Sequence, residues 1–147
     1  MRTIGNILWL VLAGLWLAIA YVIAGVVMCI LIITIPFGIQ AFKLAGFTLW
    51  PFGRTVVPNP DASPVLGCLG NLVWIVLVGW ELAVVHLVAG VMLCLTIIGI
   101  PLGLACFKLI PLALLPFGQE VVPIDEVPPG AKVAYGPPPN LGEPRVA

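Results

Sequence analysis

The chain alternates long apolar runs with short polar segments. Residues 4–35 and 69–100 carry no Lys or Arg, and together they hold one acidic residue, Glu81, and one histidine, His86. Each run exceeds the ~18 apolar residues that indicate a membrane helix. As a straight helix each would be about 48 Å long, against a hydrocarbon core of roughly 30 Å. The pattern therefore predicts that each run turns back or tilts steeply.

The turn is expected at a glycine, because Gly permits the positive φ of a tight helical hairpin. Ala24-Gly25 and Ala89-Gly90 are the candidates. The spans are then predicted at residues 4–22, 25–49, 69–87 and 90–114. We expect an all-α membrane protein with about four transmembrane or re-entrant helices. The sequence favours two passes per repeat over one, and it leaves both full crossing and re-entrant hairpins open, since a short apolar turn must satisfy its backbone groups in either arrangement.

The chain is also an internal duplication. Shifting the sequence by 65 residues aligns residues 4–57 with residues 69–122 without a gap, and 26 of the 54 positions are identical. The matches include Asn, Trp, Lys, Pro and Pro-Phe-Gly, which shared apolar composition would not align. The expected organisation is two tandem helical-hairpin repeats, a linker and a tail, over residues 1–57, 69–122, 58–68 and 123–147 respectively.

Each repeat ends in Pro-Phe-Gly followed by a short strand-like Val-Val. The linker carries three prolines and polar residues, which predicts a water-exposed segment. The tail holds seven of the 15 prolines and no long apolar run, so we expect it to be extended or disordered. Asn6 and Asn71 stand where each first helix is expected to begin, as N-caps.

Charge placement bears on orientation and on partners. With two crossings per repeat, the basic residues all face one side, which the positive-inside rule makes cytoplasmic. One crossing per repeat would instead invert the repeats. Hydrophobic residues make up 62% of the chain and charged residues 8%, with zero net charge. This composition places the chain in a lipid bilayer and argues against a nucleic-acid partner.

Paired prolines and glycines recur inside the second segment of each repeat. Pro36 and Pro101 are expected to kink that helix, and Gly38 and Gly103 to let a neighbouring backbone approach. The kinks either fit helices together or free carbonyls to line a polar path, as in transporters.

Four ionisable residues are the remaining candidates. Lys43 and Lys108 are expected to snorkel to cytoplasmic headgroups, with a cationic pair facing a bundle interior or an anionic lipid as the alternative. Glu81 and His86 replace Trp16 and Tyr21 of the first repeat. We expect them in an interface belt, with a proton-linked or ion-coordinating role as the alternative.

The sequence offers no paired carboxylates, no Ser-His-Asp set and no metal-ligand spacing, and its four cysteines read as small packing residues. We therefore expect no enzyme activity, no catalytic residue, no cofactor and no metal.

The blocks I-P-[FL]-G-x-x-x-F-K and L-x-P-F-G-x-x-V-V, each preceded by G-N-x-x-W, resemble the YccF family of small bacterial inner-membrane proteins. The resemblance covers residues 4–122 and implies a multi-pass inner-membrane protein with cytoplasmic N- and C-termini. Two functions stay open. One is a small oligomeric channel or an accessory subunit of a larger transporter. The other is a membrane scaffold or lipid-interaction protein.

Overall fold

The computed structural model describes residues 2–127 and 132–133. The first repeat contains α1 (Arg2–Trp9), a π-helical segment (Leu10–Gly14), α2 (Leu15–Ile30), a 3-10 turn (Ile32–Thr34), α3 (Ile35–Leu49) and β1 (Arg54–Pro58). The second contains α4 (Pro64–Trp74), a π-helical segment (Ile75–Gly79), α5 (Trp80–Cys94), α6 (Ile100–Leu114), β2 (Gln119–Pro123) and a 3-10 turn (Ile124–Glu126). The predicted tandem helical hairpins are confirmed.

The helices are long and apolar. Three continuous helical stretches, Arg2–Ile30, Ile32–Leu49 and Pro64–Cys94, are long and apolar enough to cross a membrane, and Ile100–Leu114 is a shorter apolar helix. Large aliphatic side chains cover their outer surfaces; Ile4, Val11, Leu66 and Val76 are 66–70% exposed. Such a surface is stable in lipid rather than in water.

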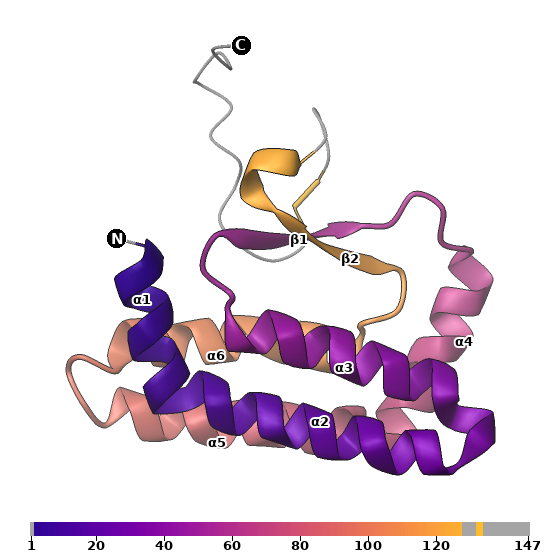
Figure 1. Cartoon of the computed structure of the whole chain (residues 1–147), viewed down its shortest axis with the longest axis horizontal. Coiled ribbons are helices and arrows are strands. Elements are labelled where there is room, and N and C mark those ends of the chain that lie inside the picture. Colours follow the sequence, from indigo (N-terminus) through magenta and orange to yellow (C-terminus); the bar gives the residue numbers. More distant parts are fainter. Residues whose placement is uncertain (1, 128–131, 134–147) are drawn as a thin grey trace.

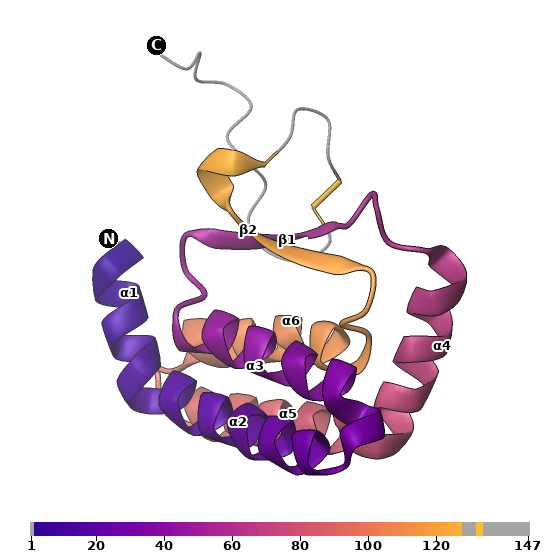
Figure 2. The same cartoon turned by 45° about the vertical axis from the view of Figure 1, so that its right-hand side comes forward.

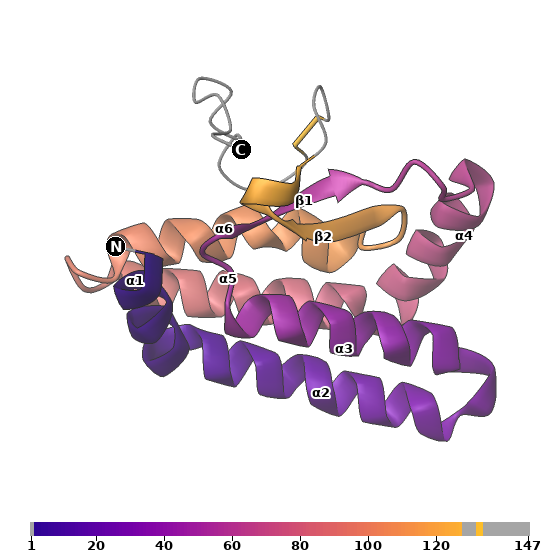
Figure 3. The same cartoon turned by 45° about the horizontal axis from the view of Figure 1, so that its top comes forward.

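The body is layered (Figures 1 and 2). α2 and α5 form the layer farthest from the sheet, α3 and α6 lie between them and the sheet, and α1 and α4 rise toward the sheet at opposite ends. In each repeat the second and third helices pack as an antiparallel hairpin, and α2 and α5 meet between the repeats. The two hairpin turns point to opposite ends of the body (Figure 3).

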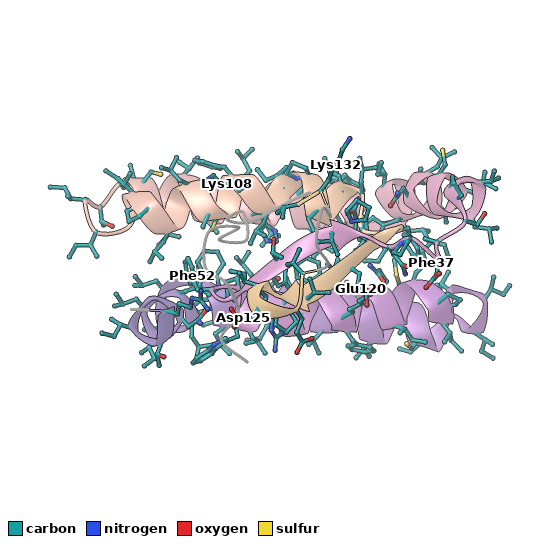
Figure 4. The ribbon with its side chains drawn as sticks, turned by 90° about the horizontal axis from the view of Figure 1, so that it is seen from above. Phe37, Phe52, Lys108, Glu120, Asp125 and Lys132 are labelled. Carbon is teal, nitrogen blue, oxygen red and sulfur yellow. The ribbon has the colours of Figure 1, made fainter. Side chains whose placement is uncertain are left out.

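The two strands predicted from the repeated Val-Val pair with each other. β1 and β2 are antiparallel, with Val56 opposite Val121 and Arg54 opposite Pro123. Val56 and Val121 are the same position in the two repeats, so the pair lies on a pseudo-two-fold axis. Seen from the sheet side, the ribbon crosses between the two rows of helices (Figure 4).

The predicted position of the hairpin turns is wrong. Ala24 and Gly25 lie within α2, Ala89 and Gly90 lie within α5, and the turns fall at residues 31–34 and 95–99. Neither glycine has a positive φ; among the described residues only Gly53 and Gly118 do. Gly25 and Gly90 instead serve close packing, because a Cβ there would meet the rings of Phe42 and Phe107. The predicted spans change accordingly.

The predicted proline kinks are also wrong. Pro36 and Pro101 stand in the first turns of α3 and α6, where the missing amide hydrogen costs no helical hydrogen bond. They start the returning helices. Pro111, which has Gly46 as its counterpart in the first repeat, is the proline inside a helix.

The linker and the tail differ in part from expectation. α4 begins at Pro64, inside the predicted linker, and Ser63 is its N-cap. In the tail, residues 124–126 form a 3-10 turn and Val127 is buried. The rest of the predicted disordered tail lies outside the described residues, apart from residues 132–133.

Candidate functional site

The recurring Asn of each repeat holds the first helix to the Pro-Phe-Gly turn. The Asn6 side chain donates to the Phe52 carbonyl (2.8 Å) and accepts from the Phe52 amide (3.0 Å). Asn71 makes the same pair with Phe117, at 3.1 and 2.9 Å. Both asparagines lie inside helices, so the N-cap prediction is wrong. In each repeat, this pair of hydrogen bonds holds the first helix against the turn that follows the third helix.

The recurring Trp links the first helix of each repeat to the end of the third helix, just before the Pro-Phe-Gly turn. The Trp9 indole donates to the Thr48 carbonyl at 2.6 Å, and Trp74 donates to the Ala113 carbonyl at 2.7 Å. Both indoles are fully buried. These hydrogen bonds satisfy polar groups that would otherwise face an apolar interior.

The candidate glycines allow close helix contact, as predicted. A Cβ on Gly38 would lie 2.9 Å from the Gly25 carbonyl oxygen and 2.5 Å from the Cys29 sulfur. Gly103 packs in the same way against Gly90 and Cys94. Most residues shared by the two repeats therefore pack or position the fold.

Two residues that differ between the repeats, Tyr21 and His86, contact each other at the pseudo-two-fold axis. The rings of Tyr21 and His86 are in edge contact, with centroids 5.6 Å apart and an interplanar angle of 71°. Both side chains are buried within the protein, at 2% and 1% exposure, and the expected depth of His86 at the membrane interface stays a prediction. His86 Nδ1 lies 2.9 Å from the Leu82 carbonyl, and Nε2 is buried without a hydrogen-bond partner among the residues that the structure describes. Tyr21 was not predicted as a site residue, although its alignment with His86 in the two repeats could have indicated it.

The other charged candidates are not brought to this contact. Lys43 on α3, Lys108 on α6 and Glu81 on α5 are all exposed. The lysines do not face the bundle interior, and Figure 4 places Lys108 on α6, in the row beside the sheet. Glu81 lies in the first turn of α5, next to the exposed Trp80.

Most described charges gather at the sheet end. They lie at the start of α1, in the two strands and in the segments that follow the strands, and are Arg2, Arg54, Asp61, Glu120, Asp125, Glu126 and Lys132, against three on α3, α5 and α6. The exposed Arg2 and Asp125 side chains form an ion pair at 3.9 Å. Since most acids and bases of the described chain lie here, this end of the molecule is the face that suits water.

The segment that follows each strand forms a hydrogen bond with the Pro-Phe-Gly turn of the other repeat. The Asn59 amide donates to the Gly118 carbonyl at 2.9 Å, and the Ile124 amide donates to the Gly53 carbonyl at 3.1 Å. Each repeat thus supports the Pro-Phe-Gly turn of the other. No local sequence motif indicates these bonds.

An open groove of about 590 Å³ lies beside α4, between the linker and the turn that follows α6. Its lining is Asn59, Ala62, Ser63, Pro64, Gly67, Cys68, Asn71, Leu72, Ile75, Leu115, Phe117 and Gly118. The described residues hold no group of three or more His, Cys, Asp or Glu side chains that could bind a metal.

Comparison with known proteins fits this duplicated architecture. The YccF family, described as an inner membrane component domain, matches at residues 4–54 and again at residues 69–119. The chain belongs to the YccF family. It is 35% identical over 133 residues to the "Inner membrane protein YccF" of Escherichia coli (strain K12), covering 85% of this chain and 90% of that protein. The Shigella flexneri protein of the same name matches equally. No solved structure matches.

The YccF assignment and the apolar helices make the chain an integral inner-membrane protein that passes into the bilayer several times. The family match covers both copies of the Asn, Trp and Pro-Phe-Gly framework. It leaves out the whole linker, residues 58–68, which forms one wall of the groove.

Proposed function

We propose that the chain is a membrane scaffold inserted from the cytoplasmic side, whose re-entrant hairpins hold the two-stranded sheet as a polar platform at the membrane surface. The observation that carries this proposal is the segregation of charge. Seven of the ten described Lys, Arg, Asp and Glu residues lie at the sheet end. The hairpin turns are apolar.

The turns suit hydrocarbon better than water. Ile33 is 92% exposed and Ile97 is 88% exposed, among neighbours that are also aliphatic. The Thr34 hydroxyl bonds to the Met28 and Leu31 carbonyls, and the Thr96 hydroxyl bonds to the Leu93 carbonyl. Because these polar groups are satisfied within the turns, lipid contact costs less than it would for an ordinary loop.

The orientation of the sheet supports the same arrangement. If α2 and α3 ran along the membrane normal, the sheet would lie at the side of the bundle, and Arg54 and Glu120 would face lipid at mid-depth. With the sheet at the surface, both repeats enter and leave on one side. Residues 2–14 then reach roughly 20 Å deep, less than the roughly 30 Å of hydrocarbon.

Cysteine accessibility tests the proposal. Single cysteines at Ile33 and Ile98, in a background without the four native cysteines, would be treated with a membrane-impermeant maleimide from the periplasmic side. Asp61→Cys on the linker is the surface control. We expect protection at both turns, and Asp61→Cys labelling only after the cytoplasmic face is opened. Periplasmic labelling of both turns would support four full crossings, and labelling of one alone would support inverted repeats.

An oligomeric channel, or an accessory subunit of a larger transporter, is the second candidate. Glu81 favours it, because this exposed carboxyl group lies on an otherwise apolar surface beside Trp80. Contact with another chain would shield it from lipid, at a site where a charge costs about 2.5–3.5 kcal/mol. The mass of the detergent-solubilised protein, compared with that of Glu81→Leu, tests this. A ring of copies lost in Glu81→Leu, together with ion flux in vesicles, would favour the channel over the scaffold.

A further inference from the structure

We infer that the groove beside α4 binds one membrane phospholipid with an amine-bearing headgroup. This inference rests on the proposed embedding, which sets the beginning of α4 at the membrane surface and its end deeper in the bilayer. The groove volume, about 590 Å³, is within the range of small-molecule sites, roughly 300–1,000 Å³.

The order of polar and apolar lining follows that of a phospholipid. Asn59 and Ser63 lie at the surface end, before and at the N-cap of α4. Leu72 and Ile75 lie two to three turns further along, where α4 meets its π-helical segment. Leu72 is 61% exposed, so the groove continues onto the apolar face of α4. A glycerol and headgroup fit the first end, and an acyl chain fits the second.

Comparison of the two repeats explains why this groove is open. The positions equivalent to Ala62, Leu115 and Gly67 in the other repeat are Val127, Trp50 and Arg2. All three are larger, and Val127 is buried, at 6% exposure. The exchanged hydrogen bonds show that Asn59 and Ile124 are structurally equivalent, and Ala62 and Val127 each lie three residues further along the chain. The smaller residues therefore leave the groove beside α4 open, whereas larger residues stand at the equivalent positions beside α1.

The charge near the groove selects the headgroup. The lining contains no Lys or Arg, and the exposed Asp61 is adjacent to Ala62. An anionic headgroup would meet a carboxylate without a compensating cation, whereas an ammonium group would be attracted to it. Phosphatidylethanolamine is the probe that fits this environment, and phosphatidylglycerol is the contrasting one.

Native mass spectrometry of the full chain in mild detergent tests the site. The probe lipids are phosphatidylethanolamine and phosphatidylglycerol, added separately. The test variant A62V/L115W fills the groove with the residue types of the equivalent positions, Val127 and Trp50. Leu87→Trp, on the exposed face of α5, is the control for added aromatic bulk. Thermal unfolding in detergent checks that both variants are folded.

We expect the unaltered chain and Leu87→Trp to bind one phosphatidylethanolamine, preferred over phosphatidylglycerol, and A62V/L115W to bind it about tenfold less tightly. A photoreactive acyl chain should crosslink to residues 64–75. Equal binding by all three proteins, or crosslinks confined to other helices, would overturn the inference. It would also be overturned if lipid bound only after removal of residues 134–147, because the tail would then be the occupant.

The outcome is separable from that of the proposed function. Protected hairpin turns combined with unchanged lipid binding in A62V/L115W would remove the lipid site alone. Turns labelled from the periplasm, combined with lost lipid binding in A62V/L115W, would remove the one-sided insertion and leave the groove as a lipid site.

Discussion

Tyr21 and His86 occupy the same position in the two repeats, and their rings touch across the pseudo-two-fold axis, with centroids 5.6 Å apart. The shared Asn and Trp residues hold each repeat together, whereas this pair, which differs between the repeats, joins one repeat to the other. The contact is therefore where the duplicated halves have diverged while remaining packed.

Replacement of His86 tests whether its polarity is used. His86→Phe keeps an aromatic ring against Tyr21 and removes the unpartnered Nε2, which offsets the loss of the Nδ1 contact to Leu82. We expect stability in detergent within about 1 kcal/mol of the unaltered chain. His86→Ala should lose about 2–4 kcal/mol through the cavity left behind. Equal losses in the two variants, measured by denaturant titration, would mean that Nε2 has a polar partner in the membrane.

The Asn clamps should be essential to the fold. Asn71→Ala removes two hydrogen bonds and leaves the Phe117 amide and carbonyl without them. We expect a loss of about 2–4 kcal/mol in the free energy of unfolding, and a similar loss for Asn6→Ala. Thermal unfolding in detergent gives the comparison. The half-buried Asn59 side chain, which accepts from the Asp61 amide, is the control, and a comparable loss in Asn59→Ala would argue against the clamp.

Two glycines on α3 give a matched pair. Gly38→Ala would press a Cβ against the Gly25 carbonyl and the Cys29 sulfur, so we expect a loss of about 1–3 kcal/mol. Gly46 has nothing within 4 Å of such a Cβ, and Gly46→Ala should stabilise the helix by up to about 1 kcal/mol. If both variants unfold at the same denaturant concentration, the close approach of α2 and α3 is wrong.

The prolines should differ by position. Pro36→Ala, in the first turn of α3, should change the free energy of unfolding by less than about 1 kcal/mol. Pro111→Ala, inside α6, should be stabilising by at least about 1 kcal/mol because it restores a helical hydrogen-bond donor. The two variants can be compared by thermal unfolding in detergent. A large loss of unfolding free energy in Pro36→Ala would contradict the helix-start role of Pro36 and favour the kink predicted from sequence.

Much of the architecture could be predicted because both copies carry the same signals. Twofold recurrence of Val-Val after Pro-Phe-Gly indicated the strands, and the absence of Lys and Arg indicated the embedded runs. The recurrence of a Gly or a Pro in both repeats could not show which of two structural roles the residue has. Gly25 serves close packing rather than a turn, and Pro36 serves helix initiation rather than a kink.

Long-range partners were also beyond the sequence. Asn6 and Phe52 are 46 residues apart, as are Asn71 and Phe117. Their joint recurrence is a signal that they belong together, but helix pattern alone assigned the asparagines to caps. The groove is open because Ala62 and Leu115 are smaller than Val127 and Trp50 at the equivalent positions. The sequence alone does not show that Ala62 and Leu115 line the same groove.

The register of the β1–β2 ribbon carries a last consequence. A ladder centred on equivalent residues, Val56 and Val121, is the arrangement that two identical half-length chains would adopt about a common axis. A chain made of one repeat would therefore carry a self-complementary strand, able to pair with a second copy through the same ladder.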